Sequence, residues 1–432
     1  MEPLIFFFRR VAEFSGDALA FLGSLEPIQF LTVFWAFFFL EIPRYVVSDL
    51  YVLARHLLTR NRRDPLMEPL PTVSVIVSVL NEERTIPSLV RSLHEQRYPH
   101  LEIIVIDDGS CDRTKEICER LAMAGAIRFF PLASRQGKSA ALTYGCRLAT
   151  GQILVFMDAD TTLDREALIK IVQPFRDERI GAVCGNVGVR NVWTNLFTRI
   201  QAVEYLIAIT VGRQFRAHMG ILGIVSGAFG AFRRELVERT GWHDPGPGND
   251  SDLTIRIRKL GKHIAFAPEA TCLTNVPDRV TAWVRQRMRW DRNVIRNRVR
   301  KHRDIYNVFH HHFRLTNLLS FVDTVFFSVV LSLTWLIYAV HMVTVYPHRY
   351  GLILFVNYCL YSAAKLTQFA IALTISERRE LWRLIVALPF FVAYRVCARV
   401  LRIVASLQEL LFHASDRDPF APEKVRKQMA PF

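Results

Sequence analysis

Leu101-Glu-Ile-Ile-Val-Ile-Asp-Asp-Gly-Ser110 is an apolar run that ends in two carboxylates. Similar apolar runs, Val73 to Leu80 and Ile153 to Met157, lie on either side of it. Each is short and rich in β-branched residues, which predicts a buried parallel strand. We expect another strand to end near Phe130. Helices are expected up to Gln96, after Ser110 and from about Lys138. This alternation predicts an α/β domain with a parallel sheet, whose ligand site lies at the carboxyl ends of the strands.

The composition indicates a membrane protein with a soluble middle. The chain has 432 residues, of which 51% are hydrophobic, and the most apolar stretches lie near its two ends. The net charge of +15 comes from Arg and Lys beside these apolar stretches, which is typical of cytoplasmic membrane flanks and argues against nucleic acid as a partner. Seven scattered cysteines without CxxC pairs predict reduced thiols in the cytosol. His310-His-His312 is interpreted as a solvated segment beside the membrane rather than a metal site.

The N-terminal 65 residues predict a membrane anchor. Residues 4–24 mix apolar and charged side chains, which favours an interfacial amphipathic helix over a span. Residues 28–40 and 42–53 together are long enough for one membrane helix with a break near Glu41 and Pro43. No signal-peptide cleavage pattern follows. The basic run from Arg55 to Arg63 is expected to keep the next domain, residues 66–300, on the cytoplasmic side.

The C-terminal region, residues 301–432, contains three further apolar runs. The runs 317–345 and 350–375 are separated by four residues and predict a helical hairpin. The third, 383–411, contains Arg395, Arg399 and Arg402, and its sequence is compatible with a span, a re-entrant segment or an interfacial helix. About twenty residues follow it. We expect regulation to need a separate accessory or export subunit.

Acidic residues follow two of the expected strands. Asp158-Ala-Asp160 after Met157 can bind a divalent cation and leave positions open for a diphosphate, although a solvated turn has the same pattern. For Asp107-Asp108 the competing interpretation is a helix cap made by Ser110 or Asp112. Between the two pairs, Lys138 is suited to neutralise a phosphate, but a surface lysine is equally common.

Together these motifs resemble the membrane-embedded, processive, inverting glycosyltransferases of family 2, which include cellulose, chitin, hyaluronan and poly-N-acetylglucosamine synthases. The resemblance covers about residues 71–300. It is carried, in order, by Val73–Glu83, Ile106–Ser110, Gly137-Lys138, Phe156–Asp160, Ser226–Arg234, Asn249–Thr254 and Gln286-Arg-Met-Arg-Trp290. It implies a Rossmann-like nucleotide-sugar fold of the A type inserted between transmembrane helices, a UDP-sugar donor and a growing polysaccharide acceptor.

The resemblance also implies roles for individual residues. The uridine pocket would be lined by Ser78, Glu82 and Asp108, and Asp107 would be a further substrate-binding residue. Asp160 would hold Mg²⁺ or Mn²⁺ on the diphosphate, with Asp158 beside it. Asp250 matches the general base that deprotonates the acceptor hydroxyl.

Gln286, Arg289 and Trp290 match the cluster that contacts the diphosphate and the acceptor sugar. Their spacing places them on one helix face. A basic helix lying on lipid phosphates is the alternative interpretation of this segment, and the two can hold for different faces.

The chain departs from the family pattern at two positions. Asn249 replaces the acidic residue that usually precedes the base, and Leu80 stands where an aromatic residue is common. Asp252 is the fallback base. Residues 181–234 resemble the acceptor side of poly-N-acetylglucosamine and chitin-oligosaccharide synthases, which favours N-acetylglucosamine over glucose as the donor sugar.

Three functions are compared. A processive synthase that exports its polymer is favoured by Gln286 to Trp290 and by membrane helices on both sides. A transferase that adds one sugar to a lipid carrier has the same fold. A non-catalytic scaffold is supported only by Asn249. We therefore expect a multi-pass protein of the inner or plasma membrane with a cytoplasmic catalytic domain, whose linkage and product length the sequence leaves open.

Overall fold

The computed structural model describes residues 2–59, 65–311, 313–376 and 378–418, together with 422, 423 and 426. Residues 60–63 of the basic run, His312 of the histidine tract and Glu377 between the last two apolar runs lie outside the described residues. All site residues expected from the sequence lie inside them.

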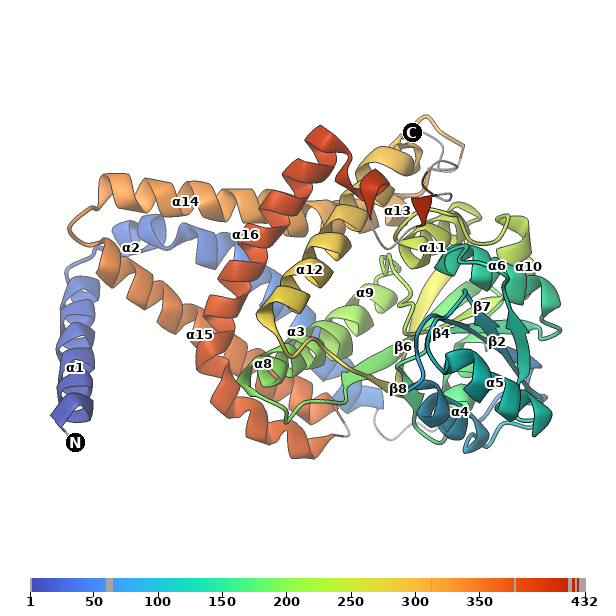
Figure 1. Cartoon of the computed structure of the whole chain (residues 1–432). Helices are drawn as coiled ribbons and strands as arrows, with labels where there is room; N and C mark the ends of the chain where they lie inside the picture. Colours follow the sequence, from blue (N-terminus) through green and yellow to red (C-terminus); the bar gives the residue numbers. More distant parts are fainter. Residues whose placement is uncertain are drawn as a thin grey trace.

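The first half of the domain is a parallel sheet, as the sequence predicts. Four parallel strands lie in the order β3-β2-β1-β4: β3 (Arg128–Pro131), β2 (Leu101–Asp107), β1 (Val73–Val79) and β4 (Ile153–Asp158). The β1 and β2 strands are almost wholly buried, as expected for strands covered on both faces. The intervening helices are α4 (Ile86–His94), α5 (Thr114–Met123) and α6 (Lys138–Leu148). Figure 1 shows them packed around these strands.

The second half makes the sheet mixed, so the expectation of a parallel sheet holds only for the first half. After β4 the order continues β7-β6-β8-β5, with β7 (Phe229–Arg233) antiparallel to both of its neighbours. The β6 strand (Ile180–Val189) pairs in parallel with β8 (His263–Thr274), and the short β5 (Thr162–Leu163) closes the edge. The antiparallel β7 lies between β4 and β6 and therefore brings the Ser226-Gly227 turn close to the end of β4.

Helices of this second half connect the sheet to the apolar regions. They are α7 (Ala167–Val172), the 3₁₀ turn η2 (Gln173–Arg176), α8 (Leu196–Tyr205), the π-helix η3 (Leu206–Arg213), α9 (Gln214–His218), α10 (Arg234–Arg239), α11 (Asn249–Lys259), α12 (Val280–Ile295) and the π-helix η4 (Arg296–Lys301).

The N-terminal region is helical, but its break differs from the predicted one. It comprises α1 (Glu2–Gly23), α2 (Pro27–Val33), η1 (Ala36–Glu41) and α3 (Ile42–Thr59). The bend of 71° lies between Val33 and Ala36, whereas the sequence suggested Pro43. Pro43 lies inside the continuous helix Ala36–Thr59, just after the π-helical turn η1, and does not bend it into two parts.

The C-terminal region consists of long helices joined by short turns. They are η5 (Arg303–Tyr306), α13 (Leu315–Val325), η6 (Phe326–Val330), α14 (Leu331–Val345), α15 (Tyr350–Ile375), η7 (Arg379–Ala387), α16 (Leu388–Phe412) and η8 (Ala414–Arg417). Within the described residues, Leu315–Val345 and Arg379–Phe412 are long and apolar enough to cross a membrane, and the bent N-terminal pair adds a third if it is one span. The helix α15 does not meet that test, although the turn expected before it is present.

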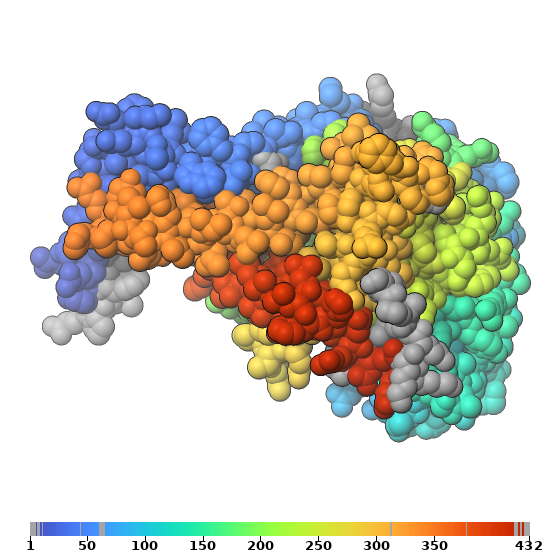
Figure 2. Space-filling model, turned by 90° about the horizontal axis from the view of Figure 1, so that it is seen from above, coloured from blue at the N-terminus to red at the C-terminus, as the bar shows by residue number. Residues whose placement is uncertain are grey.

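The N-terminal helices and α14 form an arm that extends from the sheet-containing body, and Figure 2 shows them side by side. Tyr338 of α14 donates a hydrogen bond to the carbonyl of Val33 over 2.8 Å, and Trp35 packs edge-on against the same tyrosine. A hydrophobic cluster separate from the core of the sheet contains these residues.

The helix α12 is joined to α16 along its length. Trp283 donates from its indole nitrogen to the hydroxyl of Tyr394 over 2.9 Å, and Asp291 accepts from Arg402 over 3.0 Å. Arg292 also donates to the side chain of Gln408. Three arginines of the third apolar run have carboxylate partners: Arg395 pairs with Glu204, Arg399 with Glu41 and Arg402 with Asp291.

Candidate active site

The carboxylates of Asp158 and Asp160 lie where β4 ends. Asp158 is in register with Ser78 of β1, and its side chain forms an ion pair with Lys138 at the start of α6. Asp160 accepts hydrogen bonds from the hydroxyl of Thr274 over 3.2 Å to each of its oxygens. Burial and the charge of Asp158 raise the pKa of Asp160 above its usual value. The two carboxylates therefore repel each other at one strand end.

Asp107 and Asp108 lie at the end of β2 and hold two nearby turns through hydrogen bonds. Asp107 accepts from the amide and the hydroxyl of Ser110 over 3.0 and 2.6 Å. Asp108 accepts from the amides of Gln136 and Gly137 over 2.6 and 2.9 Å. Its carboxylate thus fixes the turn before Lys138, while the predicted contact with uridine stays a prediction. Asp112 accepts from the amide of Thr114 over 3.0 Å, but the N-cap residue of α5 is Arg113, which makes no side-chain capping hydrogen bond. Neither Ser110 nor Asp112 is therefore the N-cap that the competing interpretation expected.

Glu82 lies close to the same carboxylates. It accepts a hydrogen bond from the hydroxyl of Thr85, and its backbone amide donates to Thr114 over 2.7 Å. Burial raises the pKa of Glu82, and the negative charges of Asp160 and Asp158 add to this effect. The end of β1 therefore faces the acidic end of β4.

Asp250 stands in the first turn of α11, directly after Gly248 and Asn249. Its carboxylate accepts from the amide of Ser251 over 2.7 Å. A β-carbon on Gly227 would lie 3.7 Å from Nζ of Lys138 and 3.8 Å from Oδ2 of Asp250, so both side chains border this glycine. Burial raises the pKa of Asp250, the positive charge of Lys138 lowers it, and the net shift is upward.

Lys138 thus lies between two carboxylates, Asp158 and Asp250. Burial opposes its charge, but these two acids together hold its pKa above the usual value. One small pocket is bordered by Lys138, Ser226, Gly227, Asn249 and Asp250 over an apolar floor. The structure therefore brings the residues expected for metal, phosphate and base into one centre.

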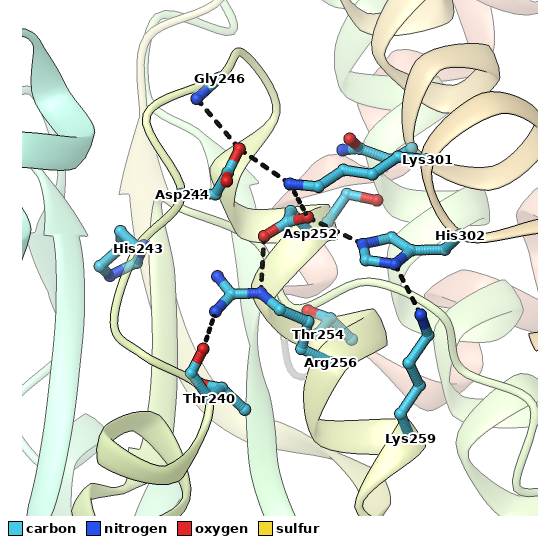
Figure 3. A network of polar contacts seen from close by, with 12 residues as sticks. Thr240, His243, Asp244, Gly246, Asp252, Thr254, Arg256, Lys259, Lys301 and His302 are labelled. Carbon is cyan, nitrogen blue, oxygen red and sulfur yellow. Dashed lines mark hydrogen bonds and ion pairs between the residues drawn. The ribbon is translucent and has the colours of Figure 1, made fainter. Parts of the chain in front are cut away.

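The carboxylate of Asp252, the fallback base, already has partners on both of its oxygens. Figure 3 shows its carboxylate surrounded by Arg256, Lys301 and His302, at 2.8, 2.7 and 2.8 Å. Burial works against its charge, but these cations and hydrogen bonds hold its pKa far below the usual value. A carboxylate that is buried and so strongly stabilised in its charged form is a poor proton acceptor. The geometry favours Asp250.

Gln286, Arg289 and Trp290 are on α12, next to this centre. Trp290 is 37% exposed, and the guanidinium of Arg287 lies 5.0 Å from the centre of its ring. Arg287 itself points inward, where it pairs with Glu204 and donates to Tyr394 over 3.1 Å. The charge of Arg289 acts on Lys138 and lowers its pKa. Different faces of α12 therefore serve packing and the site.

The chain is similar in sequence to known proteins. Residues 74–241 match the family described as glycosyl transferase family 2. The chain contains a family 2 glycosyltransferase domain. It is 34% identical over 250 residues to the probable glycosyltransferase YdaM of Bacillus subtilis, which covers 55% of this chain and 60% of that protein. It is 29% identical over 220 residues to a poly-beta-1,6-N-acetyl-D-glucosamine synthase of Staphylococcus epidermidis, covering 50% and 53%. The chain thus spans little more than half the length of these curated relatives.

A solved structure has a similar fold. It is the mannosyltransferase PcManGT from Pyrobaculum calidifontis in complex with GDP-Man and Mn2+, with a TM-score of 0.58 and 21% identity. The alignment covers 85% of this chain and 96% of that one. At this identity the likeness shows the fold alone, which is the A-type nucleotide-sugar fold predicted from the sequence.

The glycosyltransferase domain fits a divalent cation that is held largely by its substrate. Among the described residues, no three His, Cys, Asp or Glu side chains are arranged to hold a metal ion. Asp160 and Asp158 nevertheless present hard oxygen ligands whose mutual repulsion a cation would relieve. Mg²⁺ commonly binds through one or two carboxylates with substrate phosphates and water completing its shell. The residues present suit that arrangement.

Two residues of the glycosyltransferase domain were not assigned a role from the sequence. Thr274 orients Asp160 from β8. Arg190 donates to the carbonyl of Asp160 over 2.8 Å and to the carbonyl of Leu273 over 2.7 Å, which ties β4 to β8. Arg190 belongs to residues 181–234, whose sequence resembles an acceptor side, whereas a lone threonine at a strand end carries no sequence signal.

Proposed function

We propose that the chain is a metal-dependent, inverting glycosyltransferase that polymerises a sugar from a UDP-sugar donor. The observation that carries the proposal is the position of Lys138 between two carboxylates. It pairs with Asp158, which is expected beside the metal, and it borders the same glycine as Asp250, the expected base. This position places a cation suited to a diphosphate beside a carboxylate of raised pKa, which is suited to accept a proton near neutral pH.

The reaction follows from the roles of these residues. Asp250 removes the proton from the acceptor hydroxyl, and the resulting oxygen attacks the anomeric carbon of the donor. The bond from that carbon to the diphosphate oxygen breaks on the opposite face, so the configuration inverts and UDP leaves. A Mg²⁺ or Mn²⁺ ion on Asp160 would neutralise charge on the departing diphosphate. Lys138 and Arg289 would hold the phosphates, and Ser78, Glu82 and Asp108 would border the uridine, with Asp107 as a further substrate-binding residue.

The acceptor is proposed to be the growing polysaccharide. Trp290 offers an exposed aromatic face for a pyranose ring, and Gln286 an amide for hydroxyl groups. The relatives named poly-beta-1,6-N-acetyl-D-glucosamine synthase support a β-linked product and favour N-acetylglucosamine over glucose. The contacts between α12 and α16 support coupling of synthesis to export through the membrane helices. Transfer of a single sugar to a lipid carrier is the alternative.

The location follows from the apolar helices. Two or three candidate spans support a multi-pass protein of the inner or plasma membrane, with residues 66–300 as the cytoplasmic catalytic domain between two membrane regions. The lipid bilayer and an accessory export or regulatory subunit are the further partners proposed.

The test is to incubate membranes containing the chain with each labelled UDP-sugar and Mn²⁺. We expect labelled product of high molecular weight from UDP-N-acetylglucosamine. A single labelled lipid instead of polymer would reject the processive proposal in favour of the alternative.

The base is tested by Asp250→Asn, which should lower turnover by about 10²- to 10⁴-fold while UDP still binds. Asp177→Asn is the matched control, because that carboxylate pairs with Arg179 on the surface away from the site. Turnover retained by Asp250→Asn would refute the assignment of the base.

A further inference from the structure

The π-helix η4 connects the two catalytic elements of the site. It continues directly from α12, which carries Gln286, Arg289 and Trp290, and with His302 it forms what we call the η4 segment, Arg296 to His302. Single π-turns inside helices occur frequently at functional sites. This segment lies against the turn that carries Asp250.

The η4 segment holds the backbone just before Asp250. The side-chain amide of Asn297 donates to the carbonyl of Gly248 over 2.8 Å, two residues before the base. Asn297 is completely buried. Gly248 has φ +75°, and a β-carbon there would come within 2.9 Å of the Asn297 amide nitrogen. The contact is therefore close and leaves the turn little freedom.

On the other side of Asp250 the same segment holds Asp252. Lys301 and His302 contact that carboxylate at 2.7 and 2.8 Å, and Lys301 also pairs with Asp244 at 2.8 Å (Figure 3). The second ring nitrogen of His302 lies 2.9 Å from Nζ of Lys259. The ammonium of Lys259 can only donate, so Nδ1 of His302 accepts from it and Nε2–H donates to Asp252. Burial lowers the pKa of His302, which agrees with this neutral form of the ring.

A third contact reaches the glycine loop that borders the pocket. Arg298 donates to the carbonyl of Gly223 over 2.6 Å, three residues before Ser226. Ser226 and Gly227 form the wall of the pocket next to Asp250. The η4 segment thus contacts Gly248 before the base, Asp252 after it, and the loop at Gly223 that leads to the pocket wall.

Each carboxylate of this network has a cationic partner, which lets the network hold a fixed geometry. Asp252 pairs with Arg256 and Lys301, Asp244 with Lys301, and Asp304 with Lys259. Buried and fully paired polar networks specify a single arrangement, whereas removal of one partner is costly. None of these side chains is among those proposed to contact the donor, so we expect UDP to bind without the network.

We propose that the η4 segment is a positioning element that sets Asp250 relative to Gln286, Arg289 and Trp290, with Asn297 and His302 as its positioning residues. The proposal rests on the function proposed above, in which Asp250 is the base. Its consequence is that the diphosphate and acceptor contacts of α12 and the base move as one unit. Loss of the η4 contacts then misplaces the base without removing any donor contact.

The experiment uses the full chain in membranes, with Asn297→Leu and His302→Phe as variants that keep side-chain volume. UDP binding with Mn²⁺ counts the folded sites, and kcat per UDP-binding site is measured with UDP-N-acetylglucosamine. We expect kcat per site to fall about 10- to 100-fold, the effect of a misplacement on the order of 1 Å. The KM for the donor and the Kd for UDP should change by less than about threefold.

Two further variants separate positioning from general destabilisation. His302→Gln keeps a donor toward Asp252 and should recover most of the kcat lost in His302→Phe. Arg303→Gln is the control, because Arg303 follows the η4 segment in η5 and its side chain is exposed. It should keep the wild-type kcat per site.

The outcomes are distinct for the two proposals. A wild-type kcat per site in both Asn297→Leu and His302→Phe, or a rise in donor KM at unchanged kcat, would overturn the positioning role. If that occurs while Asp250→Asn is inactive, only the positioning proposal fails. If Asp250→Asn is itself fully active, the base assignment fails whatever the η4 variants do. Should Asn297→Leu bind no UDP, the comparison of His302→Phe with His302→Gln decides.

Discussion

Single charges decide the chemistry of this site, and Lys138 is the clearest case. Its ammonium borders Asp158 and Asp250, and its charge lowers the pKa of Asp250, although burial leaves the net shift upward. A base acts only when deprotonated, so activity is present above the raised pKa of Asp250 and is lost as the pH falls through it.

Lys138→Met should shift the loss of activity at low pH, which is the acid limb of the pH profile, to higher pH. Removing the ammonium removes an effect that lowers the pKa of Asp250, so the carboxyl takes up its proton at a higher pH than in the wild type. The measurement is kcat/KM against pH. Lys115→Met on the exposed face of α5 is the control and should leave the limb in place. An unmoved or lowered limb in Lys138→Met would contradict this assignment.

Thr274 provides a second prediction. Its hydroxyl donates to both oxygens of Asp160 and lowers the pKa of that carboxyl against the effect of burial. Thr274→Val should weaken the metal ligand, and the Mn²⁺ concentration for half-maximal activity should rise by about 10-fold or more. Thr271→Val on the same strand is the matched control. If both variants needed the same Mn²⁺ concentration for half-maximal activity, Thr274 would have no specific role in metal binding.

Among the elements, α6 is positioned by its fit against the sheet. Gly145 faces β1 and β2, and a β-carbon there would lie 2.5 Å from Cγ2 of Ile76. Gly145→Ala should therefore push α6 away and lower the free energy of unfolding by about 1–3 kcal/mol. Thermal unfolding measures the change.

Gly16→Ala in α1 is the control, because nothing lies within 4 Å of its added carbon. It should leave the unfolding temperature equal or slightly higher, since alanine favours a helix over glycine. Similar unfolding temperatures for both variants would show that α6 can shift at no cost.

The sequence predicted the elements better than their arrangement. The runs at β1, β2 and β4 are apolar enough to be recognised as buried strands, and their order along the chain implies parallel pairing. The insertion of antiparallel β7 between β4 and β6 could not be predicted, because it depends on contacts between distant segments. The bend before Ala36 likewise escaped prediction, since Pro43 drew attention to a position that fits inside a helix.

For the site, too, the sequence predicted the residues better than their contacts. Asp158, Asp160, Asp250 and Trp290 could be identified from motifs. The contacts of Asp252 could not, because its partners Lys301 and His302 lie about fifty residues away in the chain. The sequence therefore left two candidate bases, and only the packing of η4 distinguishes them.

At the scale of the whole molecule, the native cysteines provide a test of membrane insertion. Cys111 is exposed beside the site, and Cys359 and Cys397 are exposed on α15 and α16. If these helices lie in lipid, a membrane-impermeant maleimide should label Cys111 in inverted vesicles and leave Cys359 and Cys397 unlabelled until the bilayer is dissolved. Labelling of Cys111 in sealed right-side-out vesicles would contradict the proposed cytoplasmic side.

The hydrogen bonds that join α12 to α16 have a geometric consequence. Trp283, Asp291 and Arg292 anchor α12 to α16. If α12 contacts the acceptor and α16 crosses the membrane, as proposed, the point of sugar transfer stays at a constant height above the bilayer. A fixed transfer height means that each new unit is added at the same place in space. A polymer that remains bound can then grow only by sliding along its own axis, one sugar length for each UDP released.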